Sequence, residues 1–209
     1  MPGPRRAAAL RYDAEGGPPR TLLEVDIEPT LRLTGRPPPG TAWISCARDV
    51  ATCVLARLEG DRYTLRTLDS ETGVLGDPIH REGMPIQPTA ELSPDGTRVA
   101  MVRDTEIVLV SIADQSVEVL PLEGFSDLHY VAWRPDGESF YITGWHASDD
   151  GMFHCRVVLV DPRTATVQVV RSSESWKGQV TLSWDGRQLA WLEWDGSNDV
   201  YLYERTPPS

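Results

Sequence analysis

The sequence predicts an all-β fold, a β-propeller of four-stranded antiparallel blades with about four full blades and a partial N-terminal unit. Three observations support this prediction. Short apolar runs are separated by tight-turn residues, an Asp-Gly turn recurs along the chain, and the same order of elements follows each recurrence. The repeats are about 40 to 50 residues apart, a spacing typical of propeller blades, and the absence of helical periodicity argues against helical solenoids.

The clearest repeat runs from Glu91 to Val119 and contains four apolar runs with three polar breaks. Its first break is Ser93-Pro94-Asp95-Gly96, where each residue type favours a turn. Pro presets its backbone angle, Asp bonds its own backbone, and Gly accepts the left-handed conformation. We therefore expect four short antiparallel strands here. A sheet of this size is apolar on both faces and needs similar sheets packed on either side.

The chain supplies those further sheets. Asp136-Gly137 and Asp185-Gly186 repeat the turn, each with the same following order of apolar runs, and a degenerate copy without Pro and Gly begins near Trp43. We expect a single domain, with residues 1–40 forming an N-terminal partial blade and linker. The repeats are expected at about 41–80, 88–122, 127–172 and 177–205.

The two ends of the chain raise the question of how the ring is completed. Residues 1–40 contain proline runs and three candidate strands, Ala8–Tyr12, Thr21–Ile27 and Leu31–Thr34. The last repeat offers only three strands, Gln179–Trp184, Gln188–Trp194 and Asp199–Arg205. We expect Thr21–Ile27 to complete it as the fourth strand, since closure removes exposed edges, and we favour a monomer. The alternative is self-association, or a chain that is part of a larger protein.

Two segments carry a resemblance to known proteins: Leu92-Ser-Pro-Asp-Gly-Thr-Arg-Val-Ala, and the stretch from Leu182 through Ser-Trp-Asp-Gly-Arg-Gln-Leu-Ala. They resemble the S-P-D-G repeats of TolB-like and WD-repeat-like propellers. The resemblance extends over roughly 41–204 and implies the propeller fold. Propellers of this kind occur as protein-binding scaffolds, as gating domains beside peptidases and as sensor-like domains, so the resemblance selects no single function.

Composition restricts the class of partner. The net charge is −11, so the overall field repels phosphate backbones and anionic lipids, and we expect neither nucleic acid nor membrane as a partner. No stretch approaches the roughly 20 apolar residues that cross a bilayer, and no secretory signal is recognised, so we expect a cytoplasmic location. Cys46, Cys53 and Cys155 lack metal-type spacing. They are interpreted as buried thiols in a reducing compartment, although Cys46 and Cys53 flank a hairpin and could face each other.

One hairpin tip gathers possible metal ligands. His146, Asp149, Asp150 and His154 lie within Trp145–His154, and imidazoles and carboxylates can share a divalent ion. The spacing matches no known motif, and Asp-Asp-Gly is ordinary turn chemistry. The weak metal candidates are therefore interpreted as a solvated hairpin, and we expect no cofactor.

Tryptophans are the other candidates for binding. Most lie on first or second strands of the repeats, where large aromatic residues are expected to fill the space between blades. Trp176 stands in a polar linker and is a candidate contact site. With Trp145, His146 and Trp194 it completes the candidate binding residues, although Trp194-Asp195-Gly196 is also typical of a plain hairpin turn.

No catalytic motif of the common hydrolase, nucleotide-binding or metalloprotease types is present. We therefore expect a non-catalytic scaffold that binds a protein or peptide through its loops or an exposed strand edge. The alternative hypothesis is a small-molecule or metal site in the central channel, with a sensory or hydrolytic role.

Overall fold

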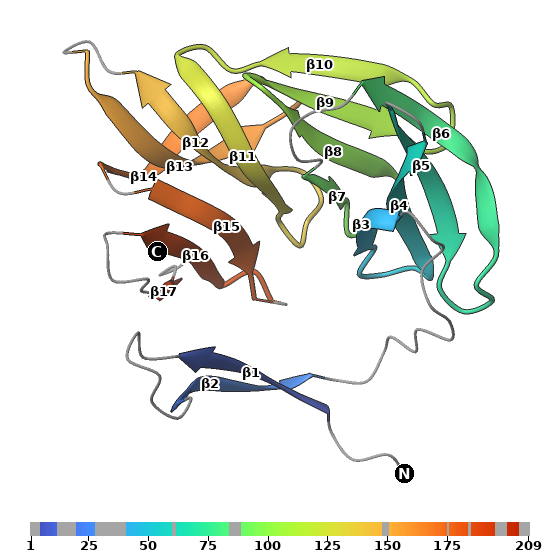
Figure 1. The fold of residues 1–209 in the computed structure, drawn as a ribbon, viewed down its shortest axis with the longest axis horizontal. Helices are drawn as coiled ribbons and strands as arrows, with labels where there is room; N and C mark the ends of the chain where they lie inside the picture. The colour runs from blue at the N-terminus through green and yellow to red at the C-terminus, as the bar shows by residue number, and fades with distance from the viewer. Residues whose placement is uncertain are drawn as a thin grey trace.

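A computed structural model describes residues 5–11, 20–27, 41–59, 62–83, 89–147, 151–174, 176–183, 185–194 and 200–204. All regular elements within these ranges are β-strands (Figure 1). Within these described ranges, no helix is long and apolar enough to cross a membrane.

From Thr41 onward, four antiparallel sheets follow one another along the chain, and each pairs consecutive strands in order. Blade 1 contains β3 (Thr41–Cys46), β4 (Thr52–Glu59), β5 (Arg62–Asp69) and β6 (Leu75–Gly83), and blade 2 contains β7 (Ala90–Leu92), β8 (Arg98–Arg103), β9 (Glu106–Ser111) and β10 (Val117–Pro121). Blade 3 contains β11 (Phe125–Trp133), β12 (Phe140–Ala147), β13 (Phe153–Asp161) and β14 (Thr166–Ser173), and blade 4 contains β15 (Trp176–Leu182), β16 (Gln188–Trp194) and β17 (Val200–Glu204). The predicted all-β fold of four-stranded antiparallel blades is confirmed.

The turn after the first strand of a blade has the geometry that its sequence requires. In blade 2, Gly96 has a φ of 73° and donates its N–H to the Ser93 carbonyl at 2.9 Å. The Ser93 hydroxyl donates to Asp95 Oδ1 at 2.6 Å, which fixes the turn from inside. Gly137 and Gly186 are also left-handed, with φ of 66° and 69°. Asp185 accepts from the Ser183 hydroxyl at 2.7 Å, as Asp95 does from Ser93.

Buried apolar residues form three clusters, one at each junction between consecutive blades. Blades alternate side chains between two apolar faces, as β8 shows. Val99 and Met101 belong to the cluster shared with blade 1, whereas Ala100 and Val102 belong to the cluster shared with blade 3. The third cluster joins blades 3 and 4 and contains Trp191. Each inner blade is therefore held between two neighbours, as a propeller requires.

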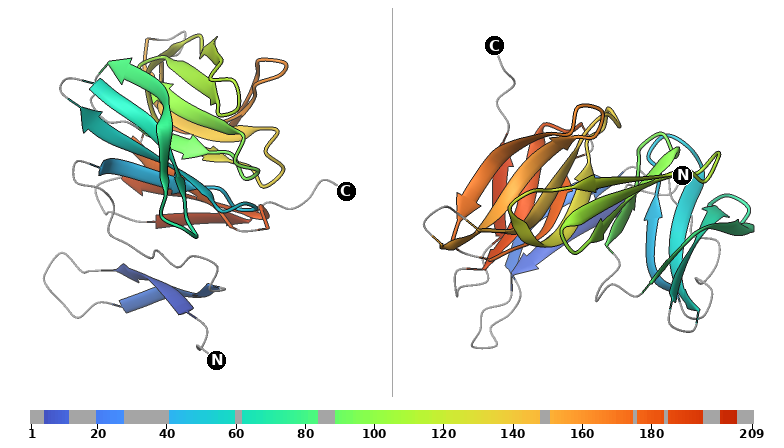
Figure 2. Two further views of the ribbon diagram at one scale, coloured as in Figure 1. Left: turned by 90° about the vertical axis from the view of Figure 1, so that its right-hand side faces the viewer. Right: turned by 90° about the horizontal axis from the view of Figure 1, so that it is seen from above.

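The sheets follow one another in an arc (Figures 1 and 2). Inner strands carry the packing between neighbours: β3 lies against β7, β7 and β8 against β11, and β11 and β12 against β15. Among the described residues, no comparable packing joins blade 4 back to blade 1.

The expected completion of blade 4 by Thr21–Ile27 is not what the structure shows. Strand β2 (Arg20–Ile27) instead pairs with β1 (Arg5–Arg11) in a hairpin with register Arg5↔Ile27, and this hairpin stands apart from the blades in Figure 1. Among the described residues, β2 belongs to a two-stranded sheet with β1, and blade 4 consists of β15, β16 and β17. The candidate strand Leu31–Thr34 lies outside the described residues.

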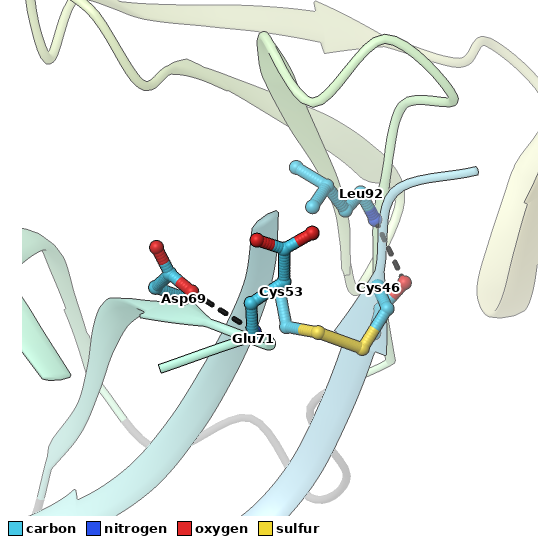
Figure 3. The surroundings of a disulfide bond; sticks show 6 residues. Cys46, Cys53, Asp69, Glu71 and Leu92 are labelled. Carbon is cyan, nitrogen blue, oxygen red and sulfur yellow. Dashed lines mark hydrogen bonds between the residues drawn. A yellow bond between two sulfur atoms is a disulfide. The ribbon is translucent and has the colours of Figure 1, made fainter. Parts of the chain in front are cut away.

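The expectation of three reduced cysteines is wrong for two of them, because Cys46 and Cys53 form a disulfide (Figure 3). They are register partners on β3 and β4, with Cα atoms 3.8 Å apart, so antiparallel pairing places the two side chains on the same face. Cys155 is a buried free thiol.

Candidate functional site

The first strands of all four blades surround a cavity of about 300 Å³ at the centre of the arc. Strand β3 contributes Trp43 and Ser45, β7 contributes Glu91, β11 contributes Tyr130, and β15 contributes Thr181. This is the position of the central channel in a propeller, where loops and inner strands of different blades converge on one volume.

A second cavity, of about 350 Å³, lies beside the turn between β3 and β4. Its wall includes Arg48 and Asp49 from that turn, Glu71 from the β5–β6 turn, and Trp133 at the end of β11. Figure 3 shows Glu71 and Leu92 near the disulfide, and both residues line this cavity. Glu91 is the one described residue that lines both cavities.

The backbone of Glu91 is held from both neighbouring blades. The Trp133 indole Nε1 donates to the Glu91 carbonyl at 2.9 Å, which ties blade 3 to blade 2. The next residue, Leu92, donates its N–H to the Ser45 hydroxyl at 3.1 Å, which ties blade 2 to blade 1. Glu91 is therefore fixed at the meeting point of three blades.

The carboxylate of Glu91 is half-buried and accepts from the Trp133 backbone N–H at 3.3 Å through Oε2. Burial raises the pKa of Glu91 from its ordinary value of 4.5 to about 7, while the Trp133 hydrogen bond and the positive charge of Arg48 oppose this shift. Desolvation of the charged form is the dominant effect. Glu91 thus changes its charge near neutral pH, which makes it the strongest candidate for a functional group.

Sequence reasoning did not single out Glu91 for its chemistry, although a signal was available. In the second, third and fourth repeats, the residue two positions before the first residue of the turn is Glu91, Ala132 and Thr181, respectively. A carboxylate therefore stands where the other two repeats have small uncharged residues. A charge on an inner strand between buried Ala90 and Leu92 marks a cavity rather than a packed interface.

The histidine candidates lie elsewhere, at the outer end of blade 3. His146 and His154 are register partners on β12 and β13, and both are half-buried. The His146 ring packs edge-on against Phe125, with ring centroids 5.1 Å apart, and lies directly over Gly124. Asp149 and Asp150 lie outside the described residues. Within the described part of the chain, no three His, Cys, Asp or Glu side chains come together to hold a metal.

Trp145 is not among the described residues that line the two cavities. Trp145 is half-buried on β12 and pairs in register with Cys155. Trp176 was expected in a polar linker, but it begins β15, where it pairs in register with Trp194 at the end of β16. The strand starts earlier than expected because a register shift between Lys177 and Val180 lets the ladder pass Gly178.

The outer strand of blade 3 is a further candidate site. Strand β14 forms the edge of its sheet, and its side chains from Thr166 to Ser172 are all exposed. They include three valines, Val167, Val169 and Val170, with exposed fractions of 40%, 48% and 44%. Within the described structure, β14 packs appreciably only against β13.

No protein-family model matches the sequence, and no curated protein matches it. Solved structures do. TolB from Acinetobacter baumannii superposes with a TM-score of 0.64 at 20% identity, covering 96% of this chain and 47% of that chain. A chain of the nidogen–laminin complex gives a TM-score of 0.62 at 13% identity, covering 89% and 64%. A prolyl endopeptidase gives 0.59 at 17% identity, covering 81% and 29%.

These likenesses show that the chain shares the β-propeller fold of TolB and of peptidase propellers over most of its length. The chain spans about half the length of TolB and less than a third of the endopeptidase. Because the neighbours include both a protein complex and enzymes, the shared fold does not determine the function.

Proposed function

We propose that this chain is a non-catalytic propeller scaffold that binds an extended segment of another polypeptide by strand addition at β14. The observation that carries the proposal is the exposed, valine-rich edge of blade 3. An unpaired strand edge offers a row of backbone donors and acceptors, and an extended peptide satisfies them by becoming a fifth strand.

The other complete blades protect their edges. Strand β6 carries Asp77-Pro78 in its middle and has two register shifts against β5, and both features block the addition of a strand. Strand β10 has only five residues and ends at Pro121. Strand β14 has eight residues and no proline, so it is the most accessible edge of the three.

The side chains of β14 also provide a surface for recognition. Val167 and Val169 lie opposite Val160 and Val158 of β13, so all four valines share the face that is turned toward blade 2. An added strand would place every second side chain beside Val167 and Val169. A register shift in the β13–β14 ladder at Val157/Val158 ends the regular stretch at Val169, so the proposed partner segment is short and apolar at alternate positions.

In the experiment, short peptides that bind the full chain are selected from a displayed library. Their affinity is then measured for variants with substitutions on a strand edge. The test variant is Val167→Lys/Val169→Lys, because lysines on an edge strand oppose strand addition. The matched control is Val117→Lys/Val119→Lys on β10, where the two valines are similarly exposed, at 48% and 41%.

We expect the selected peptides to lose at least about tenfold in affinity for the β14 variant and to bind the β10 variant as they bind the parent. Hydrogen exchange should also show new protection of β14 amides when peptide is bound. Equal binding to both variants, or protection elsewhere with none on β14, would overturn the proposal. A parent protein that dimerises through β14 would assign the edge to a second copy instead.

A further inference from the structure

We propose that the central cavity is a binding site for an organic cation, an ammonium or guanidinium group, with Glu91 as its counter-ion. This site lies on the inner strands, is separate from the β14 edge, and does not depend on the proposed peptide binding. Four observations support it: the remaining acceptor capacity of the carboxylate, the negative charge that Glu91 gives the cavity lining, the lack of further metal ligands among the described residues, and the aromatic lining.

The carboxylate of Glu91 has capacity for a ligand. Oε2 receives a single hydrogen bond, 3.3 Å long, from the Trp133 backbone N–H, and no described residue donates to Oε1. An ionised carboxylate only accepts hydrogen bonds, and its two oxygens offer about four acceptor sites. The group that completes this set must therefore be a donor, and a charged donor also offsets the desolvation of the carboxylate.

Glu91 is the one charged side chain among the described residues that line the central cavity, and the adjoining cavity that shares Glu91 is acidic overall. The cavity beside the β3–β4 turn is lined by three carboxylates, Asp49, Glu71 and Glu91, and by one guanidinium, that of Arg48. Asp49 and Glu71 are exposed, so they flank the cavity from the solvent side. The whole chain carries a net charge of −11, which attracts cations and repels anions over a longer range.

A metal ion is the less suitable cation. Divalent metals in proteins are held by several side chains at once. In the described part of the chain, no group of three His, Cys, Asp or Glu residues meets in this or another position. One carboxylate supplies too few ligands for a metal but is sufficient to pair with an ammonium or guanidinium.

Aromatic residues in the same cavity fit an organic cation. Trp43 of β3 and Tyr130 of β11 line the central cavity together with Glu91. Aromatic faces attract ammonium and guanidinium groups and also cover the carbon chain that carries them. The face of Trp133, by contrast, already carries Arg98, whose guanidinium carbon lies 5.1 Å from the ring centroid.

The cavity volume limits the ligand to a small group. About 300 Å³ lies at the lower end of the range for ligand pockets, enough for one side chain or one small amine. The same chemistry has two sources, an Arg or Lys side chain of a peptide or a free alkylamine. The experiment distinguishes them.

Calorimetry on the full chain compares the parent with Glu91→Gln and Glu118→Gln. Glu91→Gln keeps the size and an acceptor for the Trp133 N–H but removes the charge. Glu118→Gln removes one charge from exposed β10 and so controls for the net charge. The first set of probes is n-butylammonium, n-butylguanidinium and uncharged n-butanol; the second is a capped Gly-Arg-Gly peptide and its Gly-Gln-Gly counterpart.

We expect the parent and Glu118→Gln to bind the cationic probes equally, and Glu91→Gln to lose at least about tenfold in affinity. Preference for the butyl cations over the arginine peptide would identify a free amine as the ligand, and the reverse preference a peptide side chain. Equal binding by Glu91→Gln, binding of n-butanol as strong as that of the cations, or no binding of any cation by the parent would overturn the proposal.

The affinity should also depend on pH. Since the pKa of Glu91 is raised to about 7, cation binding should strengthen from about pH 6 to pH 8 as Glu91 ionises. The other ionisable groups on the two cavity walls are Arg48, Asp49, Glu71 and Tyr130. A flat profile would overturn the role of Glu91.

Discussion

Trp133 and Glu91 are joined by two hydrogen bonds across the junction of blades 2 and 3. The indole Nε1 donates to the Glu91 carbonyl at 2.9 Å, and the Trp133 backbone N–H donates to Glu91 Oε2 at 3.3 Å. One residue of β11 therefore fixes both the backbone and the side chain of Glu91, the residue that lines both cavities. The indole is only 3% exposed, so the first of these bonds is shielded from water.

The first prediction concerns that indole. Trp133→Phe keeps an aromatic ring but leaves the Glu91 carbonyl without its donor, and it weakens the contact with Arg98. We expect unfolding in urea to show a loss of about 1–3 kcal/mol, the usual cost of an unsatisfied buried polar group. Trp145→Phe is the control, because Trp145 is half-buried and no hydrogen bond of its indole is seen among the described residues. Equal losses in the two variants would show that the Trp133–Glu91 bond contributes little.

The second prediction separates the two constraints on Gly96. Gly96 and Gly73 have nearly the same left-handed φ, 73° and 72°. A Cβ at Gly73 meets nothing within 4 Å, whereas a Cβ at Gly96 would lie 2.6 Å from Val50 Cγ2 in blade 1. Gly73→Ala should therefore lose only the backbone contribution, about 1–2 kcal/mol. Gly96→Ala should lose more than Gly73→Ala, because its new Cβ also overlaps Val50 Cγ2.

The measurement is the urea midpoint of each variant against the parent. If Gly96→Ala and Gly73→Ala are equally stable, then the turn of blade 2 does not pack on blade 1 as the structure has it. A Val50→Ala background should recover much of the additional loss, because it removes the side chain that the new Cβ would meet.

The blades could be predicted from sequence because their determinants are local. The Ser93-to-Gly96 turn is closed by its own hydroxyl, carboxylate and glycine, and the same chemistry recurs at Ser183 and Gly186. The apolar runs on either side are then forced into one hairpin after another. Local turn chemistry that recurs about every 40 to 50 residues is therefore sufficient to predict a propeller of such blades.

The central site could not be predicted in the same way, because it depends on contacts between repeats. Glu91 is hydrogen-bonded by Trp133, which lies 42 residues away in the chain. Its pKa is raised by burial against the neighbouring blades. Likewise, nothing near Thr21–Ile27 indicates whether this strand pairs with blade 4 or with β1. A strand of blade 4 and strand β1 offer the same backbone donors and acceptors. The alternation of apolar and polar residues in Thr21–Ile27 therefore cannot decide between them.

The third prediction concerns the disulfide between Cys46 and Cys53. Replacing both by Ser removes a cross-link between residues seven apart in sequence, and a short loop of this kind stabilises the fold by about 2 kcal/mol. We expect the double variant to be less stable than the parent by about this amount in oxidising buffer. In reducing buffer the difference should largely disappear, because the parent then lacks the cross-link as well.

Cys155→Ser is the control for the third prediction. Cys155 is a buried free thiol, so its replacement should change stability to the same extent with and without reductant. Alkylation of the denatured, unreduced parent followed by mass measurement should find one reactive thiol. Three reactive thiols in protein purified from its native compartment would show that the bond is absent there, as is usual in reducing compartments.

The last prediction follows from the raised pKa of Glu91, which moves from 4.5 to about 7 in the folded state. A carboxyl group with a higher pKa in the folded than in the unfolded chain favours folding while it is protonated. Its contribution is fully present below about pH 4.5 and is lost as the pH rises through about 7. At 1.36 kcal/mol per pKa unit, the loss is on the order of 3 kcal/mol for the whole interval.

Glu91→Gln has no proton to lose at this position, so its stability relative to the parent should increase between pH 5 and pH 8. The measurement is the difference in unfolding free energy between parent and variant at each pH, which cancels the titration of the other carboxylates. Glu118→Gln is the matched control for the loss of one negative charge, since Glu118 is exposed on β10. A constant difference for Glu91→Gln would mean that Glu91 is solvated and ionised throughout, and the central cavity would then be open to water at this residue.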